Sequence, residues 1–382
     1  MAKLGDICVK KIDTVKATYK GNIDYIDISS VDNQCKEITQ TQNMSFKEAP
    51  SRAKQLVFPG DILVSTVRPN LNAVALITEN SDNILVASTG YCVLRCLPNV
   101  DRKYVFHFCQ SPAFIENLVM QATGASYPAV TSSIVKECTI PLPPLDEQRK
   151  IAAVLDKVSD LIAKRRQQLD KLDEFIKARF VEMFGDEHHL DDWNCVSVGE
   201  VADICVGVVI KPTQYYTDQG GVPAFRSLNI GAMTIKNADW VYFTKEGHEK
   251  NKKSIVCEND VLVVRSGAPG TACVVTKEFS GYNAVDIIIA HPNIEKINSV
   301  FLAMFTNMPH GMNQIREKTG GAAQQHFNVG GYKELTVILP PIELQNQFAA
   351  FVEQTEKTKT TISESLEKLE TLKKALMQEY FG

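Results

Sequence analysis

The chain has 382 residues, which is enough for about two to four domains, and 44% of them are apolar and 23% charged, as in ordinary globular proteins. No apolar run approaches the roughly 20 residues of a membrane-spanning helix, and the first residues lack the apolar core of a secretory signal, so we expect a cytoplasmic protein without membrane contact. The net charge of −4 excludes a strongly basic protein, but it does not exclude a local basic face.

The first 140 residues predict a mixed domain in which strands dominate. Short runs rich in β-branched and aromatic residues predict strands, and two longer apolar segments predict helices. The predicted strands are Ile23–Ile28, Ile62–Val67, Ala73–Ile77 and Tyr91–Cys96, and the predicted helices are Tyr104–Cys109 and Ala113–Gln121.

Residues 141–185 predict one long helix. Pro143 and Pro144 can immediately precede a helix, no Pro or Gly occurs from Leu145 to Phe184, and Gly185 stands where a C-terminal cap would. Apolar residues recur here at alternating steps of four and three, the heptad pattern of a coiled coil. The apolar seam positions are Ile151, Leu155, Val158, Ile162, Leu169, Leu172 and Ile176.

The second half follows the same plan. Residues 186–338 predict a second strand-rich domain, and residues 339–382 predict a second long helix with its own heptad seam. The predicted strands are Val261–Arg265, Ala272–Val275 and Ala284–Ala290, followed by a helix over Val300–Asn307. The apolar seam positions are Phe348, Val352, Ile362, Leu366, Leu369 and Leu376.

The two halves are an internal repeat. The segment Ile140–Gln148 returns as Val337–Gln345 at an offset of 197, and Phe184-Gly185 returns at the same offset as the last two residues. The sequence therefore predicts an α+β protein with two strand-rich mixed globular domains separated by two long helices. We expect the helices to form an antiparallel coiled coil, related by a pseudo-two-fold axis. The alternative is that each helix lies along a globular core.

The motifs of common enzymes are missing. There is no glycine-rich phosphate loop, no H-E-x-x-H and no G-x-S-x-G. Asp61 and Asp260 occupy equivalent positions before a strand, which is typical of turn residues rather than of catalytic carboxylates. The ten cysteines show no zinc spacing, and Cys8, Cys205, Cys257 and Cys273 lie in apolar runs that predict buried free thiols. The sequence favours a protein without catalytic residues, metal or cofactor.

Two variable domains on helices of conserved length suit a target in two parts, and DNA is such a target. Side chains able to read base edges follow the predicted strands, while a lysine cluster suits phosphates. The base-contact candidates are Arg68, Asn70, Asn72, Arg226, Arg265, Gln324 and Gln325, and the phosphate candidates are Lys250, Lys252 and Lys253. Taken singly, each of these residue types is also common on ordinary surfaces.

The repeated Pro-Pro-x-x-x-Gln before a long helix, together with Gly60-Asp-Ile-Leu-Val, resembles the specificity subunits of type I restriction–modification systems. The resemblance implies two target-recognition domains, each reading one half of a bipartite double-stranded DNA sequence, with no catalysis and no cofactor in this subunit. It implies two partner methyltransferase subunits that use S-adenosylmethionine to methylate adenine, and restriction subunits that use ATP.

Two other classes of protein stay open on the sequence. One is a coiled-coil adaptor that binds proteins and not DNA, which the acidic isoelectric point of about 6.0 favours. The other is a single-chain enzyme with an unrecognised nuclease or methyltransferase site. A gel shift with the methyltransferase partner present separates a DNA-binding subunit from an adaptor.

Overall fold

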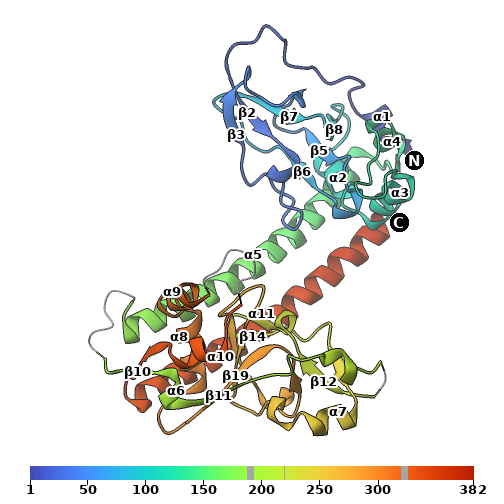
Figure 1. The fold of residues 1–382 in the computed structure, drawn as a ribbon. Helices are drawn as coiled ribbons and strands as arrows, with labels where there is room; N and C mark the ends of the chain where they lie inside the picture. The colour runs from blue at the N-terminus through green and yellow to red at the C-terminus, as the bar shows by residue number, and fades with distance from the viewer. Residues whose placement is uncertain (187–192, 219, 320–325) are drawn as a thin grey trace. The chain divides into compact units, whose positions relative to one another are not determined.

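The computed structural model describes residues 1–186, 193–218, 220–319 and 326–382, and it divides into two compact units (Figure 1). Unit 1 comprises Met1–Gln168 with Ile362–Gly382, and unit 2 comprises Leu169–Thr361. Two helices of 40 residues each contribute one part to each unit: α5 (Leu145–Phe184) and α11 (Ile342–Phe381). Both begin directly after the paired prolines, as predicted. None of the described helices has the length and hydropathy needed to cross a membrane.

Unit 1 contains a four-stranded and a three-stranded sheet. The four-stranded sheet has the order β3 (Gln42–Ser45), β2 (Asn22–Ile26), β7 (Ile84–Ser88), β4 (Ala53–Leu56). The three-stranded sheet has the order β6 (Val74–Leu76), β5 (Ile62–Ser65), β8 (Tyr91–Leu94). β2 and β7 pair in parallel, and the other pairs in these sheets are antiparallel. The central strand β5 is buried along its whole length.

The helices of unit 1 tie its sheets to the long helices. These helices are α1 (Leu4–Ile7), α2 (Arg102–Phe108), α3 (Pro112–Gln121) and α4 (Ser132–Glu137). Near the N-terminus, β1 (Ala2–Lys3) pairs with β9 (Thr139–Ile140), just before α5 begins. The C-terminal end of α11 joins the same core, where the ring of Phe381 lies 5.2 Å from that of Tyr104.

Unit 2 repeats this design. Its larger sheet has the order β11 (Ala202–Val206), β19 (Ile287–Pro292), β16 (Val261–Val264), β17 (Ala272–Val274). Its second sheet has the order β15 (Val241–Phe243), β12 (Val222–Phe225), β18 (Asn283–Ala284). Two short pairs complete the strands: β10 (Cys195–Ser197) with β20 (Thr336–Ile338), and β13 (Ile230–Gly231) with β14 (Thr234–Ile235).

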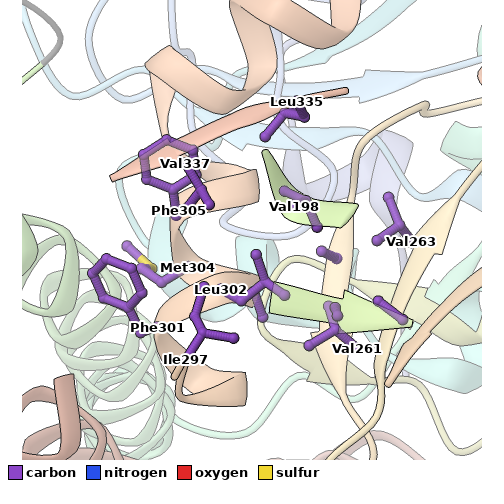
Figure 2. Close-up of a cluster of buried hydrophobic side chains, with 14 of the residues drawn as sticks. Val198, Val261, Val263, Ile297, Phe301, Leu302, Met304, Phe305, Leu335 and Val337 are labelled. Carbon is purple, nitrogen blue, oxygen red and sulfur yellow. The ribbon is translucent and has the colours of Figure 1, made fainter. Parts of the chain in front are cut away.

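The helices of unit 2 are α6 (Val198–Val201), α7 (Lys245–Lys250), α8 (Ser299–Asn307), α9 (Pro309–Lys318) and α10 (Val329–Lys333). Figure 2 shows the core of this unit, in which side chains of α8 such as Phe301 and Leu302 gather with Val261 and Val263 of β16. Phe184 of α5 packs its ring 4.9 Å from that of Phe301, so the long helix is part of this core.

The correspondence of the two units confirms the internal repeat and the α+β fold class. The parallel pair β2–β7 matches β12–β18, the pair β1–β9 matches β10–β20, and α2 to α4 match α8 to α10. One predicted strand was wrong. Ala284–Ala290 is divided into β18 and β19 because Asp286 adopts a left-handed conformation with φ of 51°.

The long helices run antiparallel within each unit. In unit 1, Arg166 of α5 pairs with Glu370 of α11 at 2.7 Å, while Leu155 shares a core with Phe381. In unit 2, Lys359 of α11 donates to Asp173 of α5 at 2.7 Å, and Phe180 packs on Phe348. Each of the 13 apolar seam residues named above is buried or partly buried, and the buried ones are Leu155, Val158, Ile162, Ile176, Phe348 and Val352.

The repeated glutamine fastens each long helix to its unit. Gln148 donates from Nε2 to the carbonyl of Pro143 at 2.8 Å and accepts the N–H of Asp101 at 3.0 Å. Gln345 makes the same two bonds in unit 2, to Pro340 at 2.8 Å and from Asn298 at 2.9 Å. Each glutamine therefore joins the first turn of a long helix to the residue that caps α2 or α8.

Candidate nucleic-acid interface

The segment after β5 carries the base-contact candidates of unit 1. Arg68 adopts a left-handed conformation with φ of 49°, and its N–H donates to the carbonyl of Pro128 at 2.7 Å. Its guanidinium lies over the ring of Tyr127 at 4.6 Å from the centroid, and that tyrosine is 68% exposed. Arg68 and Asn70 are exposed, so this turn presents an arginine and an amide to solvent beside the aromatic ring of Tyr127.

Asn72 lies differently from the sequence expectation. Its side chain is buried, and Nδ2 donates to the carbonyl of Cys109 at 2.9 Å. Its backbone carbonyl accepts the Nζ of Lys36 at 2.6 Å. Asn72 therefore anchors the turn to the C-terminal end of α2, and we remove it from the base-contact candidates.

Arg265 of unit 2 requires the same correction. It is buried, its Nε donates to the carbonyl of Phe327 at 3.1 Å, and one Nη donates to Asp286 at 2.5 Å. The other Nη lies 2.9 Å from Nε2 of His326, whose Nδ1 is 2.6 Å from the hydroxyl of Ser266. Arg265 thus organises the segment after β16 and is not presented to a base.

The remaining candidates of unit 2 lie on other elements. Arg226 is partly buried and donates to the carbonyl of Asp239. Lys252 and Lys253 are exposed on the turn after α7, and Lys250 is also exposed but pairs with Glu246 at 2.6 Å. Gln324 and Gln325 lie outside the described residues.

The repeat brings equivalent segments of the two units to equivalent places. In unit 1, Val67 bridges to Ala129, and in unit 2, Ser266 bridges to His326, 197 residues beyond Ala129. Each unit therefore sets the turn after its central strand beside the segment that precedes α4 or α10. The side chains differ: unit 1 presents Arg68 over Tyr127, and unit 2 presents Ser266 bonded to His326.

Tyr127 was not among the candidates predicted from the sequence, although its surroundings carried a signal. It lies in Gly124-Ala-Ser-Tyr-Pro128, a turn-rich stretch in which an aromatic residue has no strand or helix to pack into. Its contact with Arg68 depends on a pairing of segments about sixty residues apart, which the local pattern does not show.

Asp61 and Asp260 confirm the turn interpretation. The Asp61 carboxylate accepts the N–H of Phe58 at 2.9 Å and binds Arg95 at 2.7 Å. Asp260 accepts the N–H of Cys257 at 2.6 Å and lies 2.6 Å from Nδ1 of His291. Both carboxylates are buried and hydrogen-bonded inside the protein, so they hold the entry to the central strand.

The cysteines and the other metal-ligating side chains form no candidate metal centre within the described residues. All ten cysteines are free. Cys8 and Cys273 are buried as expected, whereas Cys257 is exposed and Cys205 is partly exposed. Cys257 lies in the turn that Asp260 closes, where the chain runs at the surface before β16 enters the core.

The family model of the type I restriction modification DNA specificity domain matches this chain twice, over residues 1–173 and 190–373. The chain belongs to this family of specificity subunits of type I restriction–modification systems. Such subunits are the non-catalytic components of type I restriction enzymes, and catalysis lies in partner subunits.

Relatives agree with this assignment along most of the chain. The MjaIX specificity subunit of Methanocaldococcus jannaschii is 19% identical over 360 residues, which cover 89% of this chain and 81% of that protein. The EcoBI specificity subunit of Escherichia coli is 22% identical over 334 residues, covering 78% of this chain and 67% of the relative.

Solved structures share the fold. One is a chain from a study of complex assembly and conformational transition of the type I R-M system, with a TM-score of 0.61 and 23% identity. The match covers 100% of this chain and 96% of the other. Another is the S subunit from M. genitalium, with a TM-score of 0.57 and 15% identity, where the match covers 100% of this chain and 95% of the other.

Proposed function

We propose that this chain reads a bipartite double-stranded DNA sequence, one half through unit 1 and the other through unit 2. In this proposal it directs adenine methylation by two methyltransferase subunits that use S-adenosylmethionine, and restriction by subunits that use ATP. It carries no cofactor itself. The coarse role, sequence specificity within a type I system, follows from the family.

The observation that carries the proposal is the pairing of a shared scaffold with unlike surfaces. The two units share the paired strands and helices matched above, the bridge that sets the segment after the central strand beside the segment before α4 or α10, and the glutamine contacts. The side chains at that turn and on the segment beside it differ, with Arg68 and Tyr127 in one unit and Ser266 and His326 in the other. Such a pattern suits a protein that reads two different half-sites.

The described side chains divide into base and phosphate candidates by their chemistry. Arg68 can bond a guanine in two places and Asn70 can do so with adenine, and Tyr127 holds the guanidinium plane. In unit 2, Lys252 and Lys253 suit phosphates as exposed ammonium groups on one turn. Arg226 is a weaker base candidate because one Nη is already bonded to Asp239.

A domain exchange tests the proposal. Residues 189–336 are replaced by the corresponding part of a relative, and the variant is expressed with the methyltransferase subunits of its own system. Methylated adenines are then mapped in genomic DNA. We expect one half of the methylated sequence to change while the other half and the spacer stay as they were.

The parent chain in the same host is the control. A domain exchange that alters both half-sites, or neither while methylation persists, contradicts the proposal. Absence of any sequence-specific methylation with the parent chain and its methyltransferase subunits favours a protein-binding adaptor instead.

A further inference from the structure

Unit 1 contains a cavity of about 310 Å³ whose lining is rich in cations. It lies beside the middle of α5 and the C-terminal part of α11. Three of its side chains are positively charged, Arg166, Lys373 and Lys374, and one is a carboxylate, Glu370, which is already paired with Arg166 at 2.7 Å. The exposed Gln34 and Lys374 line the same cavity and open it to solvent.

Lys373 has no counter-ion in this cavity. It stands four residues after Leu369 and three before Leu376, at a polar position of the α11 seam, and it is partly buried. Its Nζ lies 3.4 Å from Oε1 of Gln110. No carboxylate of the described residues forms an ion pair with it. Burial lowers the pKa of Lys373 and the neighbouring Arg166 lowers it further, and together they outweigh the charge of Asp156, which acts to raise it without forming an ion pair. A partly buried ammonium with one long amide contact lacks an anionic partner.

Lys359 shows what the same side chain does when its partners are present. It too stands at a seam position of α11, in unit 2, and its Nζ donates to Asp173 at 2.7 Å and to Glu356 at 2.8 Å. Burial acts to lower its pKa, but these two carboxylates outweigh burial and raise it. The two lysines share a helix and a seam, and they differ in whether this chain supplies the anion.

The cationic region continues from the cavity toward the candidate base-contact turn. Lys36 is partly buried, and its pKa is lowered to about 8 by burial and by the charge of Lys373. Its Nζ donates to the carbonyl of Asn72 at 2.6 Å, directly after the turn that carries Arg68 and Asn70. Gln110 directly follows Cys109 in the chain, and the backbone carbonyl of Cys109 accepts the hydrogen bond from Nδ2 of Asn72.

We propose that this cavity binds a phosphate group of the DNA backbone, with Lys373 and Arg166 as its direct contacts. The inference rests on the proposed DNA-binding function and adds to it a positioning contact beside the Arg68 turn. A phosphate oxygen supplies the anion that Lys373 lacks, and Arg166 keeps donors free after bonding one carboxylate oxygen. Such a contact fixes the register of unit 1 on the duplex without reading a base.

The test compares Lys373→Met with Lys359→Met in the full chain, assembled with the methyltransferase subunits of its own system. Both variants remove one positive charge from the same helix, so their long-range electrostatic effects are matched. Affinity for a duplex that contains the methylated sequence is measured over a range of salt concentrations. The salt slope is the slope of the logarithm of DNA affinity against the logarithm of salt concentration. We expect Lys373→Met to reduce the magnitude of this slope by about 1 and Lys359→Met to leave it unchanged.

Thermal unfolding separates this role from a structural one. Lys373→Met removes an unpaired charge from a seam, so its melting temperature stays at or above that of the parent. Lys359→Met leaves Asp173 and Glu356 without their shared cation, so its melting temperature falls. The methylated sequence is expected to be identical in the parent and in Lys373→Met, because a phosphate contact carries no base information.

Four outcomes overturn the inference. The first is an unchanged salt slope in Lys373→Met, and the second is an equal loss of slope in both variants. The third is that inorganic phosphate raises the melting temperature of the parent but not of Lys373→Met, while the two proteins have the same salt slope of DNA affinity. The site would then bind a free anion. The fourth is a parent complex that binds no duplex, which overturns the proposed function as well; the first three leave that function standing.

Discussion

At the scale of single residues, the repeated glutamine explains why two distant segments share a motif. Gln148 and Gln345 each satisfy one buried N–H and one carbonyl, and both side chains are almost fully buried. A donor and an acceptor are needed at the same tip, which glutamine provides and which an ionised carboxylate or an alkyl chain does not. The motif is therefore a joint between helix and domain.

We predict that Gln345→Leu lowers the free energy of unfolding by about 1–3 kcal/mol, because it leaves the N–H of Asn298 and the carbonyl of Pro340 without partners. The control is Gln347→Leu, an identical change at an exposed position of the same helix, which should alter stability by less than about 0.5 kcal/mol. Denaturant unfolding measures both. Equal effects of the two substitutions would contradict the role of the glutamine joint.

The strand-entry carboxylates predict a difference in pH dependence between the units. Asp260, together with the Cys205 thiol, raises the pKa of His291 from 6.5 to about 10. A raised pKa means that the folded state holds the proton more tightly, so the stabilisation is complete below about pH 6.5 and is lost as the pH rises towards 10. In unit 1 the equivalent partner of Asp61 is Arg95, which stays charged over that range.

We therefore expect denaturant unfolding of the parent to show stability falling between those two pH values, and His291→Gln to remove much of that fall. Arg95→Gln should destabilise the protein by a similar amount at both ends of the range, since the lost charge does not titrate there. A parent whose stability is flat across this interval would refute the pairing of His291 with Asp260.

At the scale of elements, the heptad seams are graded in burial. Leu155 is 0% exposed within the core of unit 1, whereas Leu169 and Leu366 are only partly buried. The period of apolar residues places all of them on one stripe of their helix. How deeply each is covered depends on what the rest of the unit lays over that stripe.

We predict that Leu155→Asp destabilises the protein by more than about 3 kcal/mol, because the carboxylate is buried among apolar side chains without a partner. Leu169→Asp should cost clearly less, since its side chain keeps access to water. Thermal unfolding of the two variants and the parent gives the ranking. The reverse order would show that burial in the seam does not control stability.

At the scale of the whole molecule, charge limits how the chain binds DNA alone. The net charge is −4, and the exposed lysines Lys252 and Lys253 form only a small basic group. Neutralised phosphates set the salt dependence of DNA affinity, and a chain with few such contacts has little to offset its overall repulsion.

We predict that the isolated chain binds a DNA duplex weakly, with an affinity that falls as salt is added, and that adding its methyltransferase subunits raises the affinity. Titration of a labelled duplex at several salt concentrations measures both the affinity and its salt dependence. Tight binding by the isolated chain that does not respond to salt would contradict this prediction.

Local and periodic features were predictable from the sequence. The bounds of α5 and α11 follow from prolines before and glycines after an uninterrupted heptad pattern, and the central strands β5 and β16 follow from short apolar runs. The two-residue strands β1 and β9 were not predicted, because a pair of residues carries no period. α9 was also missed, since its polar sequence has few apolar residues to mark a face.

By itself, then, the sequence determined the duplication, the length and period of the helices, the fold class and the family resemblance, because each is carried by neighbouring residues or by a fixed spacing. Only the tertiary structure decided which polar side chains reach solvent. The side chain of Asn72 is held inside by its hydrogen bond to the carbonyl of Cys109, 37 residues away. The side chain of Arg265 is held by its hydrogen bond to the carbonyl of Phe327, 62 residues away. Lys359 and Lys373 look alike in the heptad pattern, and only the packing of distant segments brings Asp173 to the first and a cavity to the second.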